Sequence, residues 1–316
     1  MPVTRTTLLS GPAAATFKGH TFFAWDGILV TPGLELESVD SDSQGVLDAT
    51  ASLAPVMIRF TPSAPFADLV ALYPWLEGAP GTSLFGASDT PLVLVAANGV
   101  RLTFAAAAIV GMPDLHLTAS APAVGTSVTG AVTFLALGAR SLPITAANRL
   151  VTIDSASMPS APSGTPELTD DFAITWGDEP WVSLRARDGV RIRFAMKTKS
   201  VVSDANALLD LTLERLEVEA RFTPATPGGP GEADLIEALQ LQGVNSLPGR
   251  SLAATGQMLD IAGEHLWVRL FLAQLMAGDL DFDVARGRIG ELTFVAERAF
   301  VGARAESLMS LTEGVP

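Results

Sequence analysis

The sequence is poor in the residues that carry redox and metal chemistry. Its 316 residues include no cysteine, three histidines and one tyrosine. Without cysteine the chain has no disulfide, no Cys-ligated zinc, no iron–sulfur cluster and no thiolate nucleophile. The histidines, His20, His116 and His265, lie too far apart in the sequence to form a metal-ligand motif. We therefore expect no metal site and no cofactor.

Basic residues are also scarce. The chain has 20 Lys and Arg against 34 Asp and Glu, a net charge of −14 and a pI of about 4.6. A protein that coats nucleic-acid phosphates needs the opposite balance. Because 48% of the residues are hydrophobic and only 17% are charged, we expect packed cores rather than disorder.

No apolar run is long enough to cross a bilayer as a helix. The most apolar stretch, residues 91–113, is interrupted by Asn98, Gly99 and Arg101, whereas a spanning helix needs roughly 18 uninterrupted apolar residues. The first residues also lack the pattern of a secretory signal. We expect no membrane insertion. The high mean hydropathy of +0.36 instead indicates apolar surface that is buried between subunits.

An internal repeat is the strongest signal in the sequence. Residues 26–62 align with residues 188–224 at a constant shift of 162 without a gap, and 14 of the 37 pairs are identical. The match continues from Val100–Leu102 to Val268–Leu270 and from Gly130–Phe134 to Gly290–Phe294. The repeated unit spans about 130 residues, so the chain is predicted to contain two domains of one kind.

The segment between the two copies is rich in Ser, Pro and Ala and lacks apolar periodicity, as is typical of a semi-extended linker. The predicted organisation has five parts: an N-terminal arm at 1–16, domain 1 at 17–153, a linker at 154–171, domain 2 at 172–302 and a C-terminal arm at 303–316.

Short β-branched and aromatic runs, separated by Gly, Pro and Asn, predict strands in both copies. In the first copy they are 57–61, 92–96, 101–105, 115–118 and 128–137, and in the second copy 216–223, 258–262, 266–272, 280–284 and 289–296. Asn98-Gly99 predicts a tight hairpin with a primed turn. Helical spacing over residues 65–73, with Phe66, Leu69, Val70 and Tyr73 on one stripe, predicts one short helix, with a counterpart at 232–241. The expected fold is mainly β: two tandem antiparallel sandwich or barrel domains, each with one short helix.

No catalytic motif is present: the sequence has no nucleophile elbow, zinc-protease helix, P-loop or dinucleotide fingerprint. The repeated acidic elements, Ser41-Asp42 with Asp48 and Ser203-Asp204 with Asp210, resemble paired carboxylates or a calcium site. We interpret them as turn caps that precede a strand, because no histidine or Gly-rich ligand loop accompanies them. The chain is therefore not expected to be an enzyme.

Charged residues at equivalent positions in the two copies indicate contacts in an assembly. Arg59 and Arg221 occupy the same place inside an apolar strand, which fits either an ion pair between domains or a solvent-facing side chain. An acidic cluster in the first copy corresponds to two lysines in the second, so the two copies could contact each other through residues of opposite charge. The candidate assembly residues are Glu35, Glu37, Asp40, Asp42, Arg59, Lys197, Lys199, Asp204 and Arg221.

The order of the expected elements is the same in both copies: a strand, a long excursion, a strand ending in Phe-Thr-Pro (60–62 and 222–224), a helix, a hairpin, and a last strand with the pattern Gly-x-Val/Leu-Thr-Phe. This order resembles that of the major tail tube proteins of long, non-contractile-tailed bacteriophages, in the variant with two tube domains in one chain. The resemblance covers about 270 residues.

That resemblance implies a structural virion protein made in the cytoplasm of a bacterial host. Trimeric, pseudo-hexameric rings would stack into a tube that carries phage DNA without binding it specifically. The expected partners are further copies of the chain and the tape measure, distal tail and terminator proteins. The excursions at 33–46 and 195–208 would reach neighbouring subunits, and both arms would order on stacking. Acidic walls suit passing DNA because they repel its phosphates.

Two other readings stay open. A distal tail or baseplate-hub ring protein has the same domain type but forms a single ring. A tandem β-sandwich that binds carbohydrate or mediates adhesion would need several aromatic side chains on one face, whereas the five tryptophans are scattered over positions 25, 75, 176, 181 and 267.

Overall fold

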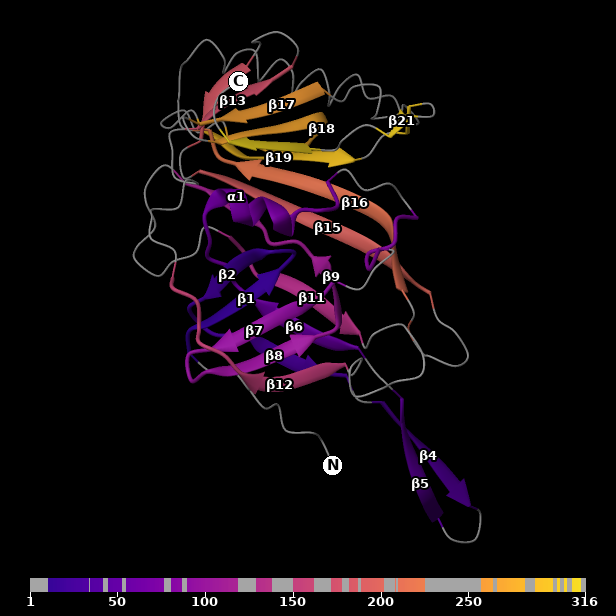
Figure 1. Ribbon diagram of the computed structural model, residues 1–316. Coiled ribbons are helices and arrows are strands. Elements are labelled where there is room, and N and C mark those ends of the chain that lie inside the picture. The colour runs from indigo at the N-terminus through magenta and orange to yellow at the C-terminus, as the bar shows by residue number, and fades with distance from the viewer. Residues whose placement is uncertain are drawn as a thin grey trace.

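The described part of the chain is mainly β, as the sequence predicts, with antiparallel sheets and one short α-helix (Figure 1). The computed structural model describes residues 11–33, 35–41, 45–52, 55–76, 81–86, 90–118, 129–137, 150–161, 172–177, 182–186, 189–201, 208, 210–224, 257–263, 266–281, 288–297, 300–301, 304–305 and 309–313. The helix predicted at 232–241 lies outside these residues.

Apart from a separate two-stranded hairpin and one strand that joins the other half, the described strands of the first half of the chain form two sheets. One has five strands in the order β12-β8-β7-β1-β2, and the other has four in the order β3-β6-β11-β9. Their bounds are β1 Ala13–Phe17, β2 His20–Ala24, β3 Leu29–Pro32, β6 Val56–Phe60, β7 Leu92–Ala96, β8 Val100–Phe104, β9 Ala106–Gly111, β11 Val132–Leu137 and β12 Val151–Ser155.

The second half, together with β10 of the first half, forms one sheet of nine strands in the order β10-β15-β16-β19-β18-β17-β13-β14, with β22 paired to β18 beside this path. A separate pair, β20 (Phe300–Val301) and β21 (Arg304–Ala305), follows β19. The bounds of the nine are β10 Leu115–Leu117, β13 Ala173–Trp176, β14 Val182–Arg185, β15 Val190–Val201, β16 Asp210–Phe222, β17 Gln257–Ala262, β18 Leu266–Asp281, β19 Arg288–Glu297 and β22 Met309–Glu313.

The two halves have the same strand order. The path β3-β6-β11-β9 of the first half recurs as β15-β16-β19-β18, and β12-β8-β7-β1-β2 recurs as β22-β18-β17-β13-β14. The difference in sheet count arises at one place. β8 and β9 are separated at Ala105, whereas β18 runs unbroken through the equivalent point and belongs to both parts. The sequence repeat therefore corresponds to a repeat in topology.

Each half has an aromatic cluster in its core. In the first half the Phe134 ring lies parallel to that of Phe60 at a centroid distance of 5.9 Å and meets Phe17 edge-on at 5.0 Å. All three side chains are buried. Such contacts add about 0.5–1.5 kcal/mol to the stabilisation from burial, and here they bind β1 of one sheet to β6 and β11 of the other.

The predicted helix is short. Residues Phe66–Leu69 form α1, and Val70–Leu72 continue as a 3₁₀ turn, η1. The tighter turn has three residues per turn rather than 3.6. Phe66, Leu69 and Leu72 are therefore buried, whereas Val70, which the sequence places on the buried stripe, is exposed.

The hairpin predicted at Asn98-Gly99 joins β7 and β8, but its turn is not of the primed type. Only Gly99 has a positive φ, of 83°. The amide of Gly99 donates to the carbonyl oxygen of Ala96 at 2.9 Å, and the Asn98 side chain accepts from the amide of Val100 at 3.1 Å. The side-chain oxygen of Asn98 thus helps to close the turn by accepting this hydrogen bond, and the backbone of Asn98 itself is not left-handed.

Strands extend into three segments that the sequence analysis treats as arms or linker. β1 begins at Ala13, within the predicted N-terminal arm, and lies between β2 and β7. β12 continues to Ser155, beyond the predicted domain limit at 153, and β22 lies inside the predicted C-terminal arm, where it pairs with β18. In each case an edge of a neighbouring strand is completed by this pairing. The domain limits themselves stay predictions.

An arginine at the equivalent position in each half pairs with an aspartate. The two aspartates lie on neighbouring strands on opposite sides of the arginine's own strand. Arg101 on β8 donates from two nitrogens to Asp154 on β12. Its counterpart Arg269 on β18 donates to Asp260 on β17, at 2.6 and 3.0 Å, and stacks on Trp267 at 4.0 Å. The two halves thus fasten different neighbours to the same strand.

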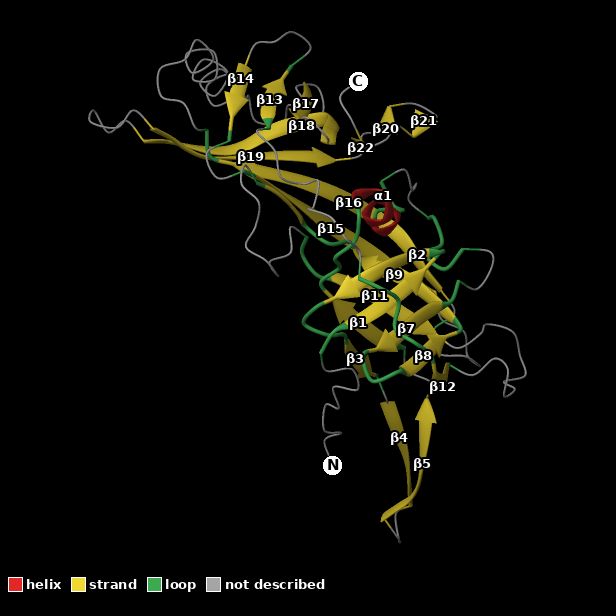
Figure 2. Ribbon diagram, turned by 60° about the vertical axis from the view of Figure 1, so that its left-hand side comes forward, coloured by secondary structure: helices red, strands yellow, loops and turns green. Residues whose placement is uncertain are grey.

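The two excursions predicted from the sequence are β hairpins. In the first half β4 (Glu35–Ser41) pairs with β5 (Gly45–Ser52) and the pair projects away from the rest of the molecule (Figure 1). In the second half β15 and β16 run as long strands from the nine-stranded sheet along the first half (Figure 2).

Candidate assembly interface

The two halves are joined by a shared sheet. β10 belongs to the first half by sequence, yet it pairs antiparallel with β15, so that Leu115 lies opposite Ile192 and Leu117 opposite Val190. These four side chains are buried. Because main-chain hydrogen bonds and apolar side chains act together across this join, it has the character of strand addition at a sheet edge.

Gly189 permits the close approach of β10. It has a φ of +92°, and a Cβ at this position would lie 2.0 Å from the carbonyl oxygen of Leu117. No other amino acid fits there without displacing β10. Asp188-Gly189 is one of the identical pairs in the repeat, and the corresponding Gly27 has a φ of +87°.

A second backbone contact lies at the start of β16. The Gly81 amide donates to the carbonyl oxygen of Leu213 at 2.7 Å, and the Leu84 amide donates to that of Leu211 at 2.7 Å. In return the Leu213 amide donates to the carbonyl oxygen of Thr82 at 2.9 Å. The first half therefore holds both strands of the β15–β16 hairpin.

The single tyrosine packs at this junction. Its ring lies 5.1 Å from that of Phe194 on β15. The Tyr73 hydroxyl donates to the carbonyl oxygen of Pro113 at 3.0 Å. Burial, and to a lesser degree the charge of Asp114, raise the pKa of Tyr73 well above its ordinary value. The hydroxyl thus keeps its proton and remains a donor.

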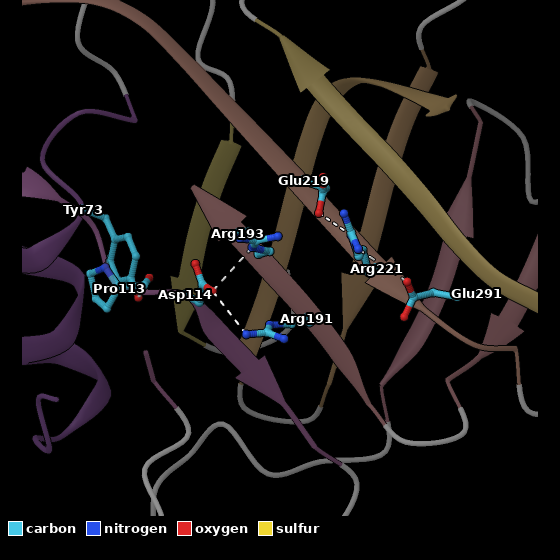
Figure 3. Close-up of polar contacts among 8 residues, drawn as sticks. All are labelled: Tyr73, Pro113, Asp114, Arg191, Arg193, Glu219, Arg221 and Glu291. Atoms are coloured by element: carbon cyan, nitrogen blue, oxygen red, sulfur yellow. Dashed lines mark hydrogen bonds and ion pairs between the residues drawn. The ribbon is translucent and has the colours of Figure 1, made fainter. Parts of the chain in front are cut away.

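Asp114 forms ion pairs with two arginines of the second half. Its carboxylate lies 3.6 Å from Arg191 and 3.7 Å from Arg193, both on the exposed side of β15 (Figure 3). Both arginines are more than half exposed, and such pairs contribute about 0–1 kcal/mol each. These two ion pairs therefore contribute more to how the two halves are oriented at the join than to its stability.

His116 lies opposite Arg191 in the β10–β15 register. Burial and the charge of Arg191 lower the pKa of His116, while Asp114 acts in the opposite direction. The Nε2 atom is buried and has no hydrogen-bond partner in the described part of the chain. A neutral imidazole is therefore the form that this junction favours.

The two arginines that the sequence singled out lie in equivalent registers. Arg59 is exposed on β6, opposite Thr133, and Arg221 lies on β16 opposite Thr293. Arg221 contacts Glu219 on its own strand and Glu291 on β19 at 3.7 Å (Figure 3). Both of these ion pairs lie within one half, because the two carboxylates belong to the same sheet, and an ion pair of Arg221 between domains stays a prediction.

The other predicted assembly residues are not gathered into one site by the described residues. Lys197 pairs with Glu214 of its own hairpin at 3.0 Å, and Lys199 is exposed on the same strand. Glu35, Glu37 and Asp40 lie on β4, and Asp42 and Asp204 lie outside the described residues. Opposite charges meeting between copies therefore stays a prediction.

The residues that build the join were missed from sequence. The sequence predicts a strand at 115–118 and a helix that includes Tyr73, but it does not indicate that these elements contact the second half. The Asp-Gly pair that precedes β15 was the available signal, because an identical glycine suggests a special backbone conformation.

Among the described residues, no helix has the length and apolar character needed to span a membrane. No group of three or more potential metal ligands occurs in this part of the chain either.

The fold and the join define a mainly β protein of two like antiparallel units connected through a common sheet. The sequence matches no protein-family model and no curated protein. Among solved structures, the chain is similar to a cryo-EM structure of the anti-feeding prophage cap, described as the AFP tube terminating cap. The similarity has a TM-score of 0.28 and 12% identity, and covers 49% of this chain and 97% of that one.

Proposed function

We propose that the chain is a structural protein of a phage-type tail, which assembles with further copies of itself into trimeric, pseudo-hexameric rings that stack as a tube. The observation that supports this most is the repeat of one strand order within the chain, with its two copies joined edge to edge. A contact between unlike surfaces generates a ring when repeated through a closing rotation.

The role is architectural rather than catalytic. The tube would lie in the virion and would contact tape measure, distal tail and terminator proteins at its ends. Its lumen would pass DNA without specific binding, since a protein with a net charge of −14 repels phosphates at long range.

Negative-stain electron microscopy of the purified protein, with light scattering to measure its mass, tests this function. Hollow tubes or stacked rings are the expected result. Single rings that never stack would favour the distal tail or baseplate-hub role. A monomer that persists at high concentration would contradict self-assembly, and binding to a glycan array in that state would favour the adhesion module.

A further inference from the structure

The edge of β3 is equivalent to the edge of β15 that β10 covers. Val30 pairs with Ile58 on β6 in the same way as Ile192 pairs with Ala220 on β16. These two pairs are related by the shift of 162 residues that aligns the repeat. β15 has β10 on its other side, whereas β3 ends its sheet and pairs, among the described residues, with β6 alone.

The second half contains the equivalent of β10. Leu115 forms a bridge with Thr129, and Leu280 pairs with Ile289. Thr129 and Ile289 are equivalent, because each immediately precedes the glycine of the repeated Gly-x-Val/Leu-Thr-Phe strand. The sequences agree as well, with Asp-Leu-His-Leu at 114–117 and Asp-Leu-Asp-Phe at 279–282. On its other side, no strand covers residues 280–281 within the described residues.

We propose that these two edges bind each other between two copies of this chain. Leu280–Asp281 of one chain pairs with Leu29–Val30 of the next and repeats the join that Leu115–His116 makes with Arg191–Ile192 inside the chain. This inference rests on the proposed self-assembly and names its contact. The described residues of each chain provide one donor edge and one acceptor edge for this contact, so the association is head to tail.

Burial and chemistry at the acceptor edge fit such a partner. Uncovered strands invite pairing with another chain. Ile28 and Val30 are buried like their counterparts Val190 and Ile192. A strand added beside β3 could therefore extend the hydrophobic core on this face. The outward-facing position differs, because Leu29, 38% exposed, stands where β15 has Arg191. In the contact between chains Leu29 therefore takes the place of Arg191, and Asp281 takes the place of His116.

Engineered cysteines test the register directly, since the natural chain has none. His116 lies opposite Arg191 within the chain, so Asp281 should lie opposite Leu29 of the neighbour. Opposed Cα atoms in antiparallel strands are ~4.5–5.5 Å apart, within the range that a disulfide spans. The test protein carries Leu29→Cys and Asp281→Cys, and the matched control carries His116→Cys and Arg191→Cys.

Mild oxidation and non-reducing gel electrophoresis give the readout, with electron microscopy of the same samples. We expect a ladder of covalent oligomers from the test protein, a single covalent dimer when the two single variants are mixed, and an internal crosslink without a ladder from the control. A ladder without tubes would support the contact and contradict the tube. Rings or tubes without the ladder, while the control crosslinks, would overturn the contact alone. A monomer without crosslinks between chains would overturn both.

Discussion

The ring of Phe222 lies parallel to the ring of Phe294 at a centroid distance of 5.8 Å, and Trp176 meets Phe294 edge-on at 5.3 Å. This cluster reproduces that of Phe60, Phe134 and Phe17 in the first half, with tryptophan in place of one phenylalanine. Sequence identity, strand order and side-chain geometry therefore agree that the two halves are built alike.

Truncating the central ring should destabilise either half to a similar degree. Phe134→Ala and Phe294→Ala each remove a fully buried ring from the core of one half, so we expect a loss of about 3–5 kcal/mol in the free energy of unfolding. Guanidinium unfolding followed by circular dichroism measures it. Met57→Ala, at a position that is 48% exposed, serves as control and should change stability by less than about 0.5 kcal/mol.

Gly189→Ala should detach β10 from β15. The new Cβ would overlap the carbonyl oxygen of Leu117, and the positive φ adds strain of about 1–3 kcal/mol. Gly99→Ala is the matched control, because Gly99 also has a positive φ but the nearest atom to its Cβ would be 3.6 Å away. Hydrogen exchange should increase at Leu117 and Ile192 in the first variant only. Equal exchange in both variants would show that the close approach is unimportant.

The join between the halves should weaken as the pH falls. The pKa of His116 is lowered in the folded protein, so below the ordinary value of ~6.5 the unfolded chain binds more protons than the folded one. Stability attributable to this group is therefore present above pH ~6.5 and is lost progressively below it. His116→Gln should remove this part of the dependence. Identical slopes of unfolding free energy between pH 7 and 5 in both proteins would contradict it.

The two arginine–aspartate contacts should differ in strength. Arg269 is partly buried and also stacks on Trp267, so Arg269→Met should cost about 1.5–3 kcal/mol, the range for hydrogen bonds to charged groups. Arg101 is more exposed, and Arg101→Met should cost less. Urea unfolding at low and high salt measures both. A larger loss at Arg101 would contradict the ranking.

Removing the β4–β5 hairpin should leave both halves folded and prevent polymerisation. In the described part of the chain these strands pair only with each other, so replacing residues 35–52 with a short turn spares both sheets. Circular dichroism tests folding and electron microscopy tests assembly. Normal tubes from the shortened protein would show that the hairpin makes no essential contact.

The repeat made the mainly β fold predictable from sequence, and several strands with a buried face were found, among them β6, β7 and β11, whereas β2 and β9 were missed although each has buried residues. Leu92–Ala96 matches β7 residue for residue, because a short run of aliphatic and β-branched residues bounded by Pro91 and Asn98-Gly99 is a strong strand signal. β12 was missed since its side chains are largely exposed, with Ile153 at 70%. β1 was missed because it begins with three alanines, which pack closely between two strands but have weak strand propensity.

The site was less predictable than the fold. Charged residues drew attention to Arg59, Arg221 and Lys197, whereas the join depends on backbone pairing at β10 and on the space left by Gly189. A sequence pattern does not reveal which side of a strand is covered. It was the comparison of the two halves in space that distinguished a covered edge from an open one.

Arg101 and Arg269 pair with aspartates on opposite sides of their strands, and this difference bears on whether the two units can exchange strands during folding. A chain with two like units risks exchanging their last strands. If β22 replaced β12, Arg101 would lie between Val95 and Ser310 and would have no acid, while Arg269 would face both Asp260 and Asp154. The mismatched charges would disfavour this exchange, so each unit would favour its own closing strand.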